Sequence, residues 1–215
     1  MSEPKPTLGP LRLAVLISGG GSTMTNIARH IAEGELHAVI SLVVASNDTA
    51  ASTGIERAKQ LGLPVEIVIR KQFPDTASFS DRVWSLIREA KADLVVLGGF
   101  LSLLNIPDDY RHKVMNIHPA LLPDFGGKGM FGHHVHEAVI QSGAKESGCT
   151  VHFADNQYDH GPVILQRRCP VLPTDTPDDL AHRVMAEERI AYPQAIELFA
   201  QGKITIKDNR VIFAV

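Results

Sequence analysis

Residues 13–23 of the chain read LAVLISGGGST. The apolar run at the start of this stretch predicts a buried β-strand, because strands covered on both faces carry continuous hydrophobic runs. The glycines at 19–21 break the strand, and Ile27 and Ile31 are spaced for one face of a helix over 23–33. The stretch therefore predicts a strand, a tight glycine-rich turn and a helix, in that order.

The same alternation continues through the first half of the chain. Apolar strands are predicted at three further places, and amphipathic helices at two: strands over 39–45, 65–69 and 93–97, and helices over 55–61 and 79–90. Strands and helices that alternate with short connections are typical of a parallel sheet covered by helices. We therefore expect an α/β, Rossmann-like fold with a mostly parallel central sheet and helices on both faces.

The second half predicts shorter strands and fewer helices. Strands are expected over 113–117, 150–154 and 163–166, helices from near His133 and over 178–191, and a C-terminal hairpin of 204–206 and 211–213. Pro193 is expected to kink the last helix or to start a new one, because proline removes a helical hydrogen bond. We expect residues 1–10, which are polar and proline-rich, to be disordered, and residues 11–215 to form a single domain.

Composition limits the classes of function. The chain has 215 residues, 44% of them hydrophobic, and a net charge of −3 from 21 basic and 24 acidic residues. This balance does not indicate a nucleic-acid partner, because proteins that bind nucleic acid usually carry a clustered excess of basic residues. The apolar stretches are too short to span a membrane. The two cysteines do not make a disulfide scaffold. We expect a cytoplasmic protein, as a monomer or homodimer, with small-molecule partners.

The glycine-rich turn is a candidate anion site. Glycines let the backbone approach a ligand, and the N-terminus of the following helix offers free N–H groups and a positive dipole end. Met24 stands where a dinucleotide fingerprint needs its third glycine, and no lysine completes a Walker loop. The turn thus favours a single phosphate, at Gly20, Gly21, Ser22 and Thr23, with a purely structural turn as the alternative.

A second candidate site is the sequence Asn116-Ile117-His118-Pro119 at the end of a predicted strand. Alternate residues of a strand point the same way, so Asn116 and His118 share a face while Ile117 is expected to face the core. An amide donor beside an imidazole suits a reaction through a tetrahedral oxyanion, with one group binding the charge and the other moving a proton. A polar turn that caps the strand remains the alternative.

Two further segments carry polar side chains. Asp159 lies in a predicted turn, where it would orient His118 if the fold brings them together, although aspartate is also a common turn-former. His152 faces either the cleft or the sheet edge. His133, His134 and His136 are close in sequence, but no cysteine or carboxylate set with metal spacing accompanies them, so we expect no metal site.

Together the motifs resemble a known family. The segments 17–22, 116–123 and 148–153, followed by Asp159 and by 161–164, resemble in this order the phosphoribosylglycinamide formyltransferases, over about residues 11–200. The block at 116–123 is the most specific part and is shared in modified form by other folate-dependent formyltransferases. The loop over 126–132 is similar to one subgroup's version of the loop beside the active site.

The resemblance implies a reaction and a set of residues. The amine of 5′-phosphoribosylglycinamide would attack the formyl group of 10-formyltetrahydrofolate, giving the N-formyl product and tetrahydrofolate in purine biosynthesis, without a metal. Asn116 would hold the oxyanion, His118 would stabilise it and take part in proton transfer, and Asp159 would raise the imidazole pKa and organise a water. The rate is expected to fall at low pH as the amine and Asp159 become protonated.

Other positions gain an implied role only through the resemblance. Gly21, Ser22 and Thr23 match the phosphate loop, and Glu188 matches an acid that contacts the ribonucleotide. The apolar wall on the folate side would consist of Phe100, Leu101, Leu104 and Val114, which without the resemblance read equally well as core. Three positions depart from the family pattern: Thr23, where asparagine is frequent, Met185, which replaces a polar residue, and His160, where glycine is common.

Related activities remain as alternatives. A formyltransferase for methionyl-tRNA would be expected to carry a further C-terminal domain and a basic surface, and a formyltetrahydrofolate deformylase an added N-terminal domain. A sugar-nucleotide formyltransferase is harder to separate, although the phosphate loop favours a ribonucleotide. A non-catalytic nucleotide-binding module would use the glycine loop alone and would not need Asn116 or Asp159.

Overall fold

The computed structural model describes residues 9–47 and 52–214, in two compact units, residues 1–115 and 116–215. The predicted disorder of residues 1–10 falls almost wholly outside the described residues, and the single domain over 11–215 stays a prediction.

Unit 1 contains the alternating strands and helices that the sequence predicts. Its elements are β1 (Leu11–Ile17), α1 (Ser22–Ala32), β2 (Ala38–Ala45), α2 (Ser52–Gln60), β3 (Val65–Ile67), α3 (Thr76–Glu89) and β4 (Leu94–Leu97), with short 3-10 turns at Arg70–Gln72 and Asp108–Tyr110. Strand β1 pairs in parallel with β2 and with β4, and β2 pairs in parallel with β3. Each predicted element is confirmed, with ends that differ by a few residues.

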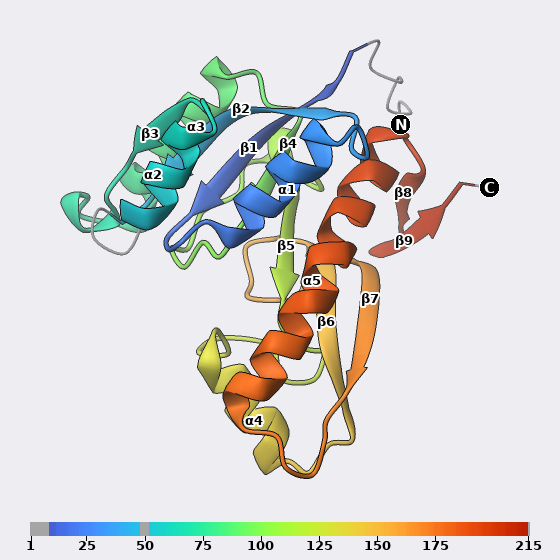
Figure 1. Ribbon diagram of the computed structural model, residues 1–215. Coiled ribbons are helices and arrows are strands. Elements are labelled where there is room, and N and C mark those ends of the chain that lie inside the picture. The colour runs from blue at the N-terminus through green and yellow to red at the C-terminus, as the bar shows by residue number, and fades with distance from the viewer. Residues whose placement is uncertain (1–8, 48–51, 215) are drawn as a thin grey trace. The chain divides into compact units, whose positions relative to one another are not determined.

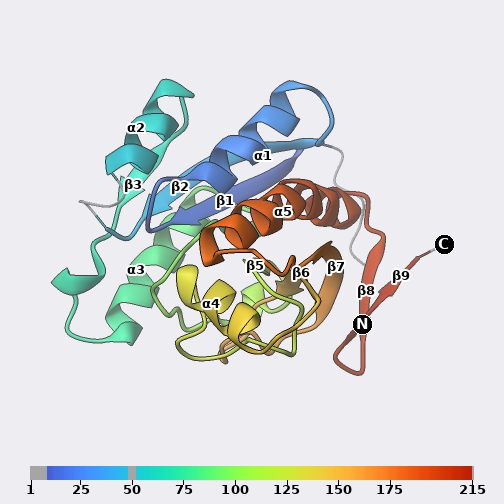
Figure 2. The ribbon, with the colours of Figure 1, turned by 60° about the horizontal axis from the view of Figure 1, so that its bottom comes forward.

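Helices cover both faces of the sheet in unit 1. Helices α1 and α2 lie on one face and α3 lies on the other (Figure 1; Figure 2). Crossovers between parallel strands are right-handed, so helices lie on one face when strands are added on one side of β1 and on the other face when the next strand is added on its opposite side. Because both faces are covered, the residues of β1 from Leu13 to Ile17 are completely buried, which explains the continuous apolar run.

The strand order places a switch point in unit 1. From β1 the chain adds β2 and β3 on one side and then returns to add β4 on the other, giving the order β3-β2-β1-β4. The carboxyl ends of β1 and β4 are therefore neighbours, and the loops that leave them diverge. Ligands of doubly wound sheets bind at this kind of position.

Strand β5 (Val114–His118) is where the chain passes from unit 1 to unit 2. Unit 2 also contains α4 (His133–Gln141), β6 (Glu146–Phe153), β7 (Val163–Pro170), α5 (Pro177–Ala200), β8 (Ile204–Lys207) and β9 (Arg210–Phe213). Strands β6 and β7 are antiparallel, and α5 packs along both (Figure 1). The mostly parallel sheet and the C-terminal hairpin of β8 and β9 are confirmed.

Helix α5 continues through Pro193 to Ala200 as one element, so the expectation that a new helix starts at Pro193 was wrong, whereas the alternative of a kink stays a prediction. A proline inside a helix loses one backbone hydrogen bond, but Tyr192, Pro193 and Ile196 are all buried, and burial of this apolar face offsets that loss. The helix begins with a capping box of Thr176 and Asp179, which satisfies N–H groups of the first turn.

Candidate active site

Two polar side chains leave the end of β5 on the same face of the strand. Asn116 and His118 alternate with Ile117, and both contact Asp159 from the loop between β6 and β7. The prediction that Asn116 and His118 share a face is thereby confirmed, whereas Ile117 is half-buried rather than part of the fully buried core. The register of a short strand thus brings an amide and an imidazole to one place.

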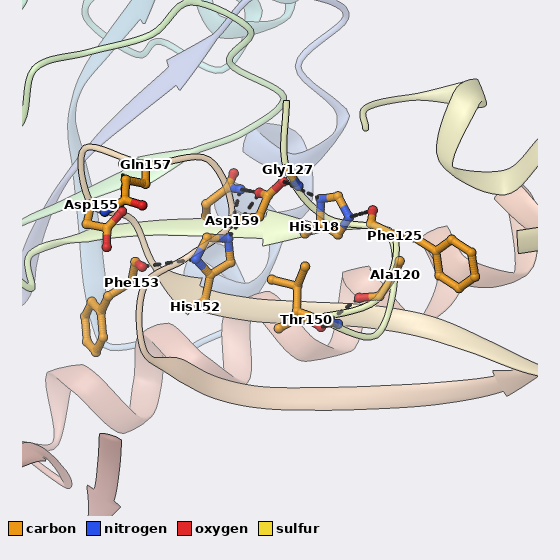
Figure 3. Close-up of polar contacts among 12 residues, drawn as sticks. His118, Ala120, Phe125, Gly127, Thr150, His152, Phe153, Asp155, Gln157 and Asp159 are labelled. Carbon is orange, nitrogen blue, oxygen red and sulfur yellow. Dashed lines mark hydrogen bonds and ion pairs between the residues drawn. The ribbon is translucent and has the colours of Figure 1, made fainter. Parts of the chain in front are cut away.

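Asp159 is the centre of this cluster (Figure 3). Its Oδ2 accepts a hydrogen bond from the Gly127 amide at 2.9 Å and lies 3.4 Å from Nδ1 of His118, while its Oδ1 lies 3.5 Å from Nδ2 of Asn116. The side chains of His118 and Asp159 are only 3% and 10% exposed. The buried carboxylate of Asp159 thus has polar partners on both oxygens: a side-chain amide, an imidazole and a backbone N–H.

His152 joins the cluster from β6. Its Nδ1–H donates to the Phe153 carbonyl at 3.0 Å, and its Nε2 lies 3.2 Å from Nδ2 of Asn116 and 3.6 Å from Oδ1 of Asp159. The pairing of β6 with β7 shifts register between Val151 and His152, and such bulges re-aim the side chains beside them. His152 therefore faces the cluster, and of the two orientations that the sequence left open, the structure selects this one (Figure 3).

The imidazole of His118 is mainly neutral near pH 7. Its burial lowers the pKa below the ordinary value of 6.5, and this effect outweighs Asp159 and the Phe125 carbonyl, which both raise the pKa. Asp159 thus acts on the imidazole pKa in the expected direction, but desolvation of the buried ring is the larger effect and sets the net direction. Nε2–H of His118 donates to the Phe125 carbonyl at 2.8 Å, which fixes the proton on Nε2 and directs Nδ1 toward Asp159.

Asp159 remains ionised throughout the neutral range. Burial by itself raises its pKa, but the contacts with His152, His118 and the Gly127 amide outweigh burial and hold the pKa below 3.8. The sequence-based expectation that protonation of Asp159 contributes to a loss of rate at low pH thus applies only to strongly acidic conditions. Around pH 7 the cluster combines an amide donor, a neutral imidazole and a charged carboxylate.

A buried threonine fixes the segment that follows His118. Thr150 donates to the Ala120 carbonyl at 2.7 Å and accepts from the Leu122 amide at 3.0 Å, and Gln166 donates to the Leu122 carbonyl at 2.8 Å. Thr150 and Gln166 lie on β6 and β7 and hold the loop that supplies Phe125 and Gly127. No role was predicted for either residue from the sequence, although Thr150 lies two residues before His152 in the same predicted strand and so shares its face.

The predicted phosphate loop lies at the switch point of unit 1. Gly21 has φ +68° and forms the N-cap of α1, so the first N–H groups of the helix have no partner within it. The Ser18 hydroxyl contacts the Ser46 hydroxyl at 2.6 Å and accepts from the Leu101 amide at 2.9 Å, which ties the loops after β1 and β4 together. This geometry fits a phosphate on the backbone of Gly20 to Thr23, an assignment that stays a prediction.

Helix α2 supports the phosphate loop from the side. A Cβ added at Gly54 would overlap the Gly19 carbonyl oxygen, so the two backbones are in direct contact. Arg57, one turn further along α2, donates to the Gly20 carbonyl at 2.6 Å. This exposed guanidinium adds positive charge beside the candidate phosphate site.

Substitution of Gly54 by alanine is expected to displace the phosphate loop. The new methyl group would meet main-chain atoms, which cannot rotate away, and overpacking of this kind costs about 1–3 kcal/mol of stability. We expect a lower thermal midpoint and a higher KM for the ribonucleotide. Gly9→Ala is the control, because a Cβ at Gly9 meets nothing within 4 Å; equal behaviour of the two variants would contradict the expectation.

The four residues predicted for the folate side differ in exposure. Leu104 and Val114 are buried in the core of unit 1, whereas Leu101 is 64% exposed. Phe100 is half-buried and stacks on Phe79 with ring centroids 6.4 Å apart. Of these four residues, only Phe100 and Leu101 are thus open to direct contact with a ligand. Leu104 and Val114 could contribute only by packing beneath such a contact.

Glu188 lies on α5 in unit 2 and is half-buried. Burial raises its pKa to about 7, against the opposing charge of Arg189. Its neighbour Glu187 instead forms an ion pair with Arg167 at 2.6 Å. A carboxyl group in this state can either accept from or donate to a sugar hydroxyl, which suits the predicted ribose contact; the contact itself stays a prediction.

The three histidines near the start of α4 do not converge. His133 contacts Glu137 and Asp178, His134 contacts Glu137, and His136 is buried. Within residues 9–47 and 52–214, no group of three or more histidine, cysteine, aspartate or glutamate side chains is placed to hold a metal ion. In the same ranges no helix is both long and apolar enough to cross a membrane.

Comparison with known proteins identifies the family. Residues 11–196 match the formyl transferase family. The chain belongs to this family. A phosphoribosylglycinamide formyltransferase of Haemophilus influenzae is 32% identical over 200 residues, which are 92% of this chain and 91% of that protein. The chloroplastic phosphoribosylglycinamide formyltransferase of Vigna unguiculata is 38% identical over 93% of this chain, which spans only 64% of the length of that relative.

Solved structures of the formyl transferase family share the fold. Glycinamide ribonucleotide transformylase 1 from Symbiobacterium toebii matches with a TM-score of 0.88 and 34% identity, covering 95% of this chain and 94% of that one. A formyltetrahydrofolate deformylase from Pseudomonas syringae has a TM-score of 0.82 at 21% identity, covering 96% of this chain and 66% of that one. At this lower identity the likeness concerns the fold alone.

Proposed function

We propose that this chain transfers the formyl group of 10-formyltetrahydrofolate to the amine of 5′-phosphoribosylglycinamide. The observation that carries the proposal is the cluster of Asn116, His118 and the ionised Asp159, at the positions that the family resemblance assigns to catalysis. The glycine-rich N-terminus of α1 supports a phosphorylated acceptor. The names of the relatives from Haemophilus influenzae and Symbiobacterium toebii agree with the same substrate.

The chemistry follows from the charges of the cluster. The substrate amine attacks the formyl carbon, and an Nδ2–H of Asn116 donates to the oxygen that becomes negative. The attacking amine becomes acidic and gives one proton to the charged carboxylate of Asp159, which passes it to Nδ1 of His118, 3.4 Å from Oδ2 of Asp159. The resulting imidazolium stabilises the negative oxygen. Collapse of the intermediate breaks the bond from carbon to the folate nitrogen, and that nitrogen takes up this same proton as tetrahydrofolate leaves, so that His118 and Asp159 return to their starting forms.

An acceptor assay tests the proposal. The protein is incubated with 10-formyltetrahydrofolate and with 5′-phosphoribosylglycinamide, an amino-sugar nucleotide, or no acceptor, and formation of tetrahydrofolate is followed. We expect turnover with the ribonucleotide alone. Turnover without acceptor would identify a deformylase, turnover with the sugar nucleotide would identify the alternative transferase, and no turnover in any mixture would favour a non-catalytic binding module.

The pH dependence of kcat/KM is a second expected result. An α-amine has a pKa of about 7.7–8.0 and attacks only in its neutral form, so the rate should fall as the pH drops from 8 to 5. Asp159, with its pKa below 3.8, stays charged throughout this interval and does not contribute to the fall. The acid limb should therefore persist in Asp159→Asn at a lower rate, and a flat profile from pH 5 to 8 in the parent protein would contradict the assignment.

The compartment and the assembly remain proposals. We propose a cytoplasmic location and the absence of a nucleic-acid or membrane partner on the grounds of composition, and a monomer or homodimer as the assembly. The name of the Vigna unguiculata relative places that protein in the chloroplast. Cell fractionation tests the compartment, and light scattering of the purified protein tests the assembly.

A further inference from the structure

The loop between β6 and β7 carries Asp159 in an unusual backbone conformation. Asp159 has φ +52°, in the left-handed region that residues other than glycine seldom adopt. Its side chain is nevertheless buried and directed at Asn116 and His118 (Figure 3). A residue on a loop that is held in such a conformation needs contacts on both sides to keep its direction.

The base of this loop is closed by the backbone. The Phe153 amide donates to the Pro162 carbonyl at 2.9 Å, where β6 ends and β7 begins. Gly161 packs so tightly on the Phe153 carbonyl that a Cβ at this position would overlap the oxygen. These contacts fix the residues after Asp159 to the sheet, but they do not reach the outer part of the loop.

Asp155 bridges the outer part. Its Oδ1 accepts from the Gln157 amide at 2.8 Å, and its Oδ2 contacts Nδ1 of His160, also at 2.8 Å. One carboxylate thus holds a residue that precedes Asp159 and the residue that directly follows it. Figure 3 shows Asp155 and Gln157 on the loop that carries Asp159.

We propose that Asp155 and His160 are positioning residues that hold Asp159 in its catalytic direction. The pair lies toward solvent, with side chains 37% and 53% exposed, and an ion pair of this kind contributes little to global stability. Its effect is therefore local: it restricts the loop around Asp159. The kinetic part of this inference rests on the proposed function, whereas the structural part does not.

Four variants test the pair. In His160→Ala the contact is removed, and we expect kcat to fall by about 10-fold with KM for the ribonucleotide unchanged, because small misplacements of reacting groups cost rate rather than binding. In His160→Asn the amide nitrogen stands near the position of Nδ1 and should restore most of kcat. Asp155→Ala should resemble His160→Ala. His182→Ala, which alters an exposed histidine on α5, is the matched control.

A double-mutant cycle separates positioning from an independent effect. If His160 acts through Asp159, His160→Ala should cause little further loss in the Asp159→Asn background. An equal 10-fold loss in both backgrounds, or an unchanged kcat in the parent background, would overturn the proposal. Amide hydrogen exchange of Gln157 gives a readout that needs no substrate: faster exchange in His160→Ala is expected, and unchanged exchange would overturn the proposal even if the parent protein transferred no formyl group.

Discussion

Asn116→Ala is expected to lower kcat for formyl transfer by roughly 10²–10³, which corresponds to about 3–4 kcal/mol of transition-state stabilisation. Nδ2 of Asn116 contacts both His152 and Asp159, so the amide is part of the cluster. Because the oxygen is neutral in the bound substrate and negative in the transition state, KM should change little. Steady-state kinetics with both substrates varied measures the two effects separately.

The control for Asn116→Ala is Gln201→Ala. Gln201 carries the same amide group but lies at the end of α5, where its Nε2 contacts Glu197 at 2.7 Å. Its removal should leave kcat unchanged. Thermal unfolding of both variants separates a catalytic loss from a loss of folded protein. An Asn116→Ala variant that remains folded with parental kcat would remove the amide from the mechanism.

Asp159→Asn is expected to lower kcat by roughly 10²–10⁴, the range typical of an acid–base group. Asparagine tolerates the left-handed conformation at φ +52° as well as aspartate does, so the substitution removes charge without adding backbone strain. The pKa of His118 should fall further, because the charge of Asp159 raises it against burial. Titration of the His118 ring by NMR measures this shift directly.

Asp208→Asn is a closely matched control for Asp159→Asn. Asp208 has a φ of +49°, almost the same as Asp159, but it lies in the turn between β8 and β9. Its substitution should alter neither kcat nor the titration of His118. A downward shift of the His118 pKa in Asp159→Asn with an unchanged kcat would show that the carboxylate sets the charge of the ring without taking part in proton transfer.

Local sequence patterns predicted most of the elements because burial imposes them. The continuous apolar run of β1 and the spacing of Ile27 and Ile31 on α1 follow from which faces are covered, so they are readable in the sequence. The face shared by Asn116 and His118 follows from the two-residue period of a strand. The start of a new helix at Pro193 was predicted wrongly, because a local penalty says nothing about the apolar surface that α5 buries around this residue.

The sequence by itself determined the strand, turn and helix predicted over residues 13–33, the alternation of elements and the presence of an amide and an imidazole on one strand face. The tertiary structure alone decided which groups meet them. Asp159 and His152 are 43 and 36 residues from Asn116, and they meet it because β5 and β6 are neighbours in the sheet and the loop after β6 carries Asp159. The net charge of His118 is likewise a tertiary property, because it depends on how far burial of the ring outweighs the carboxylate beside it.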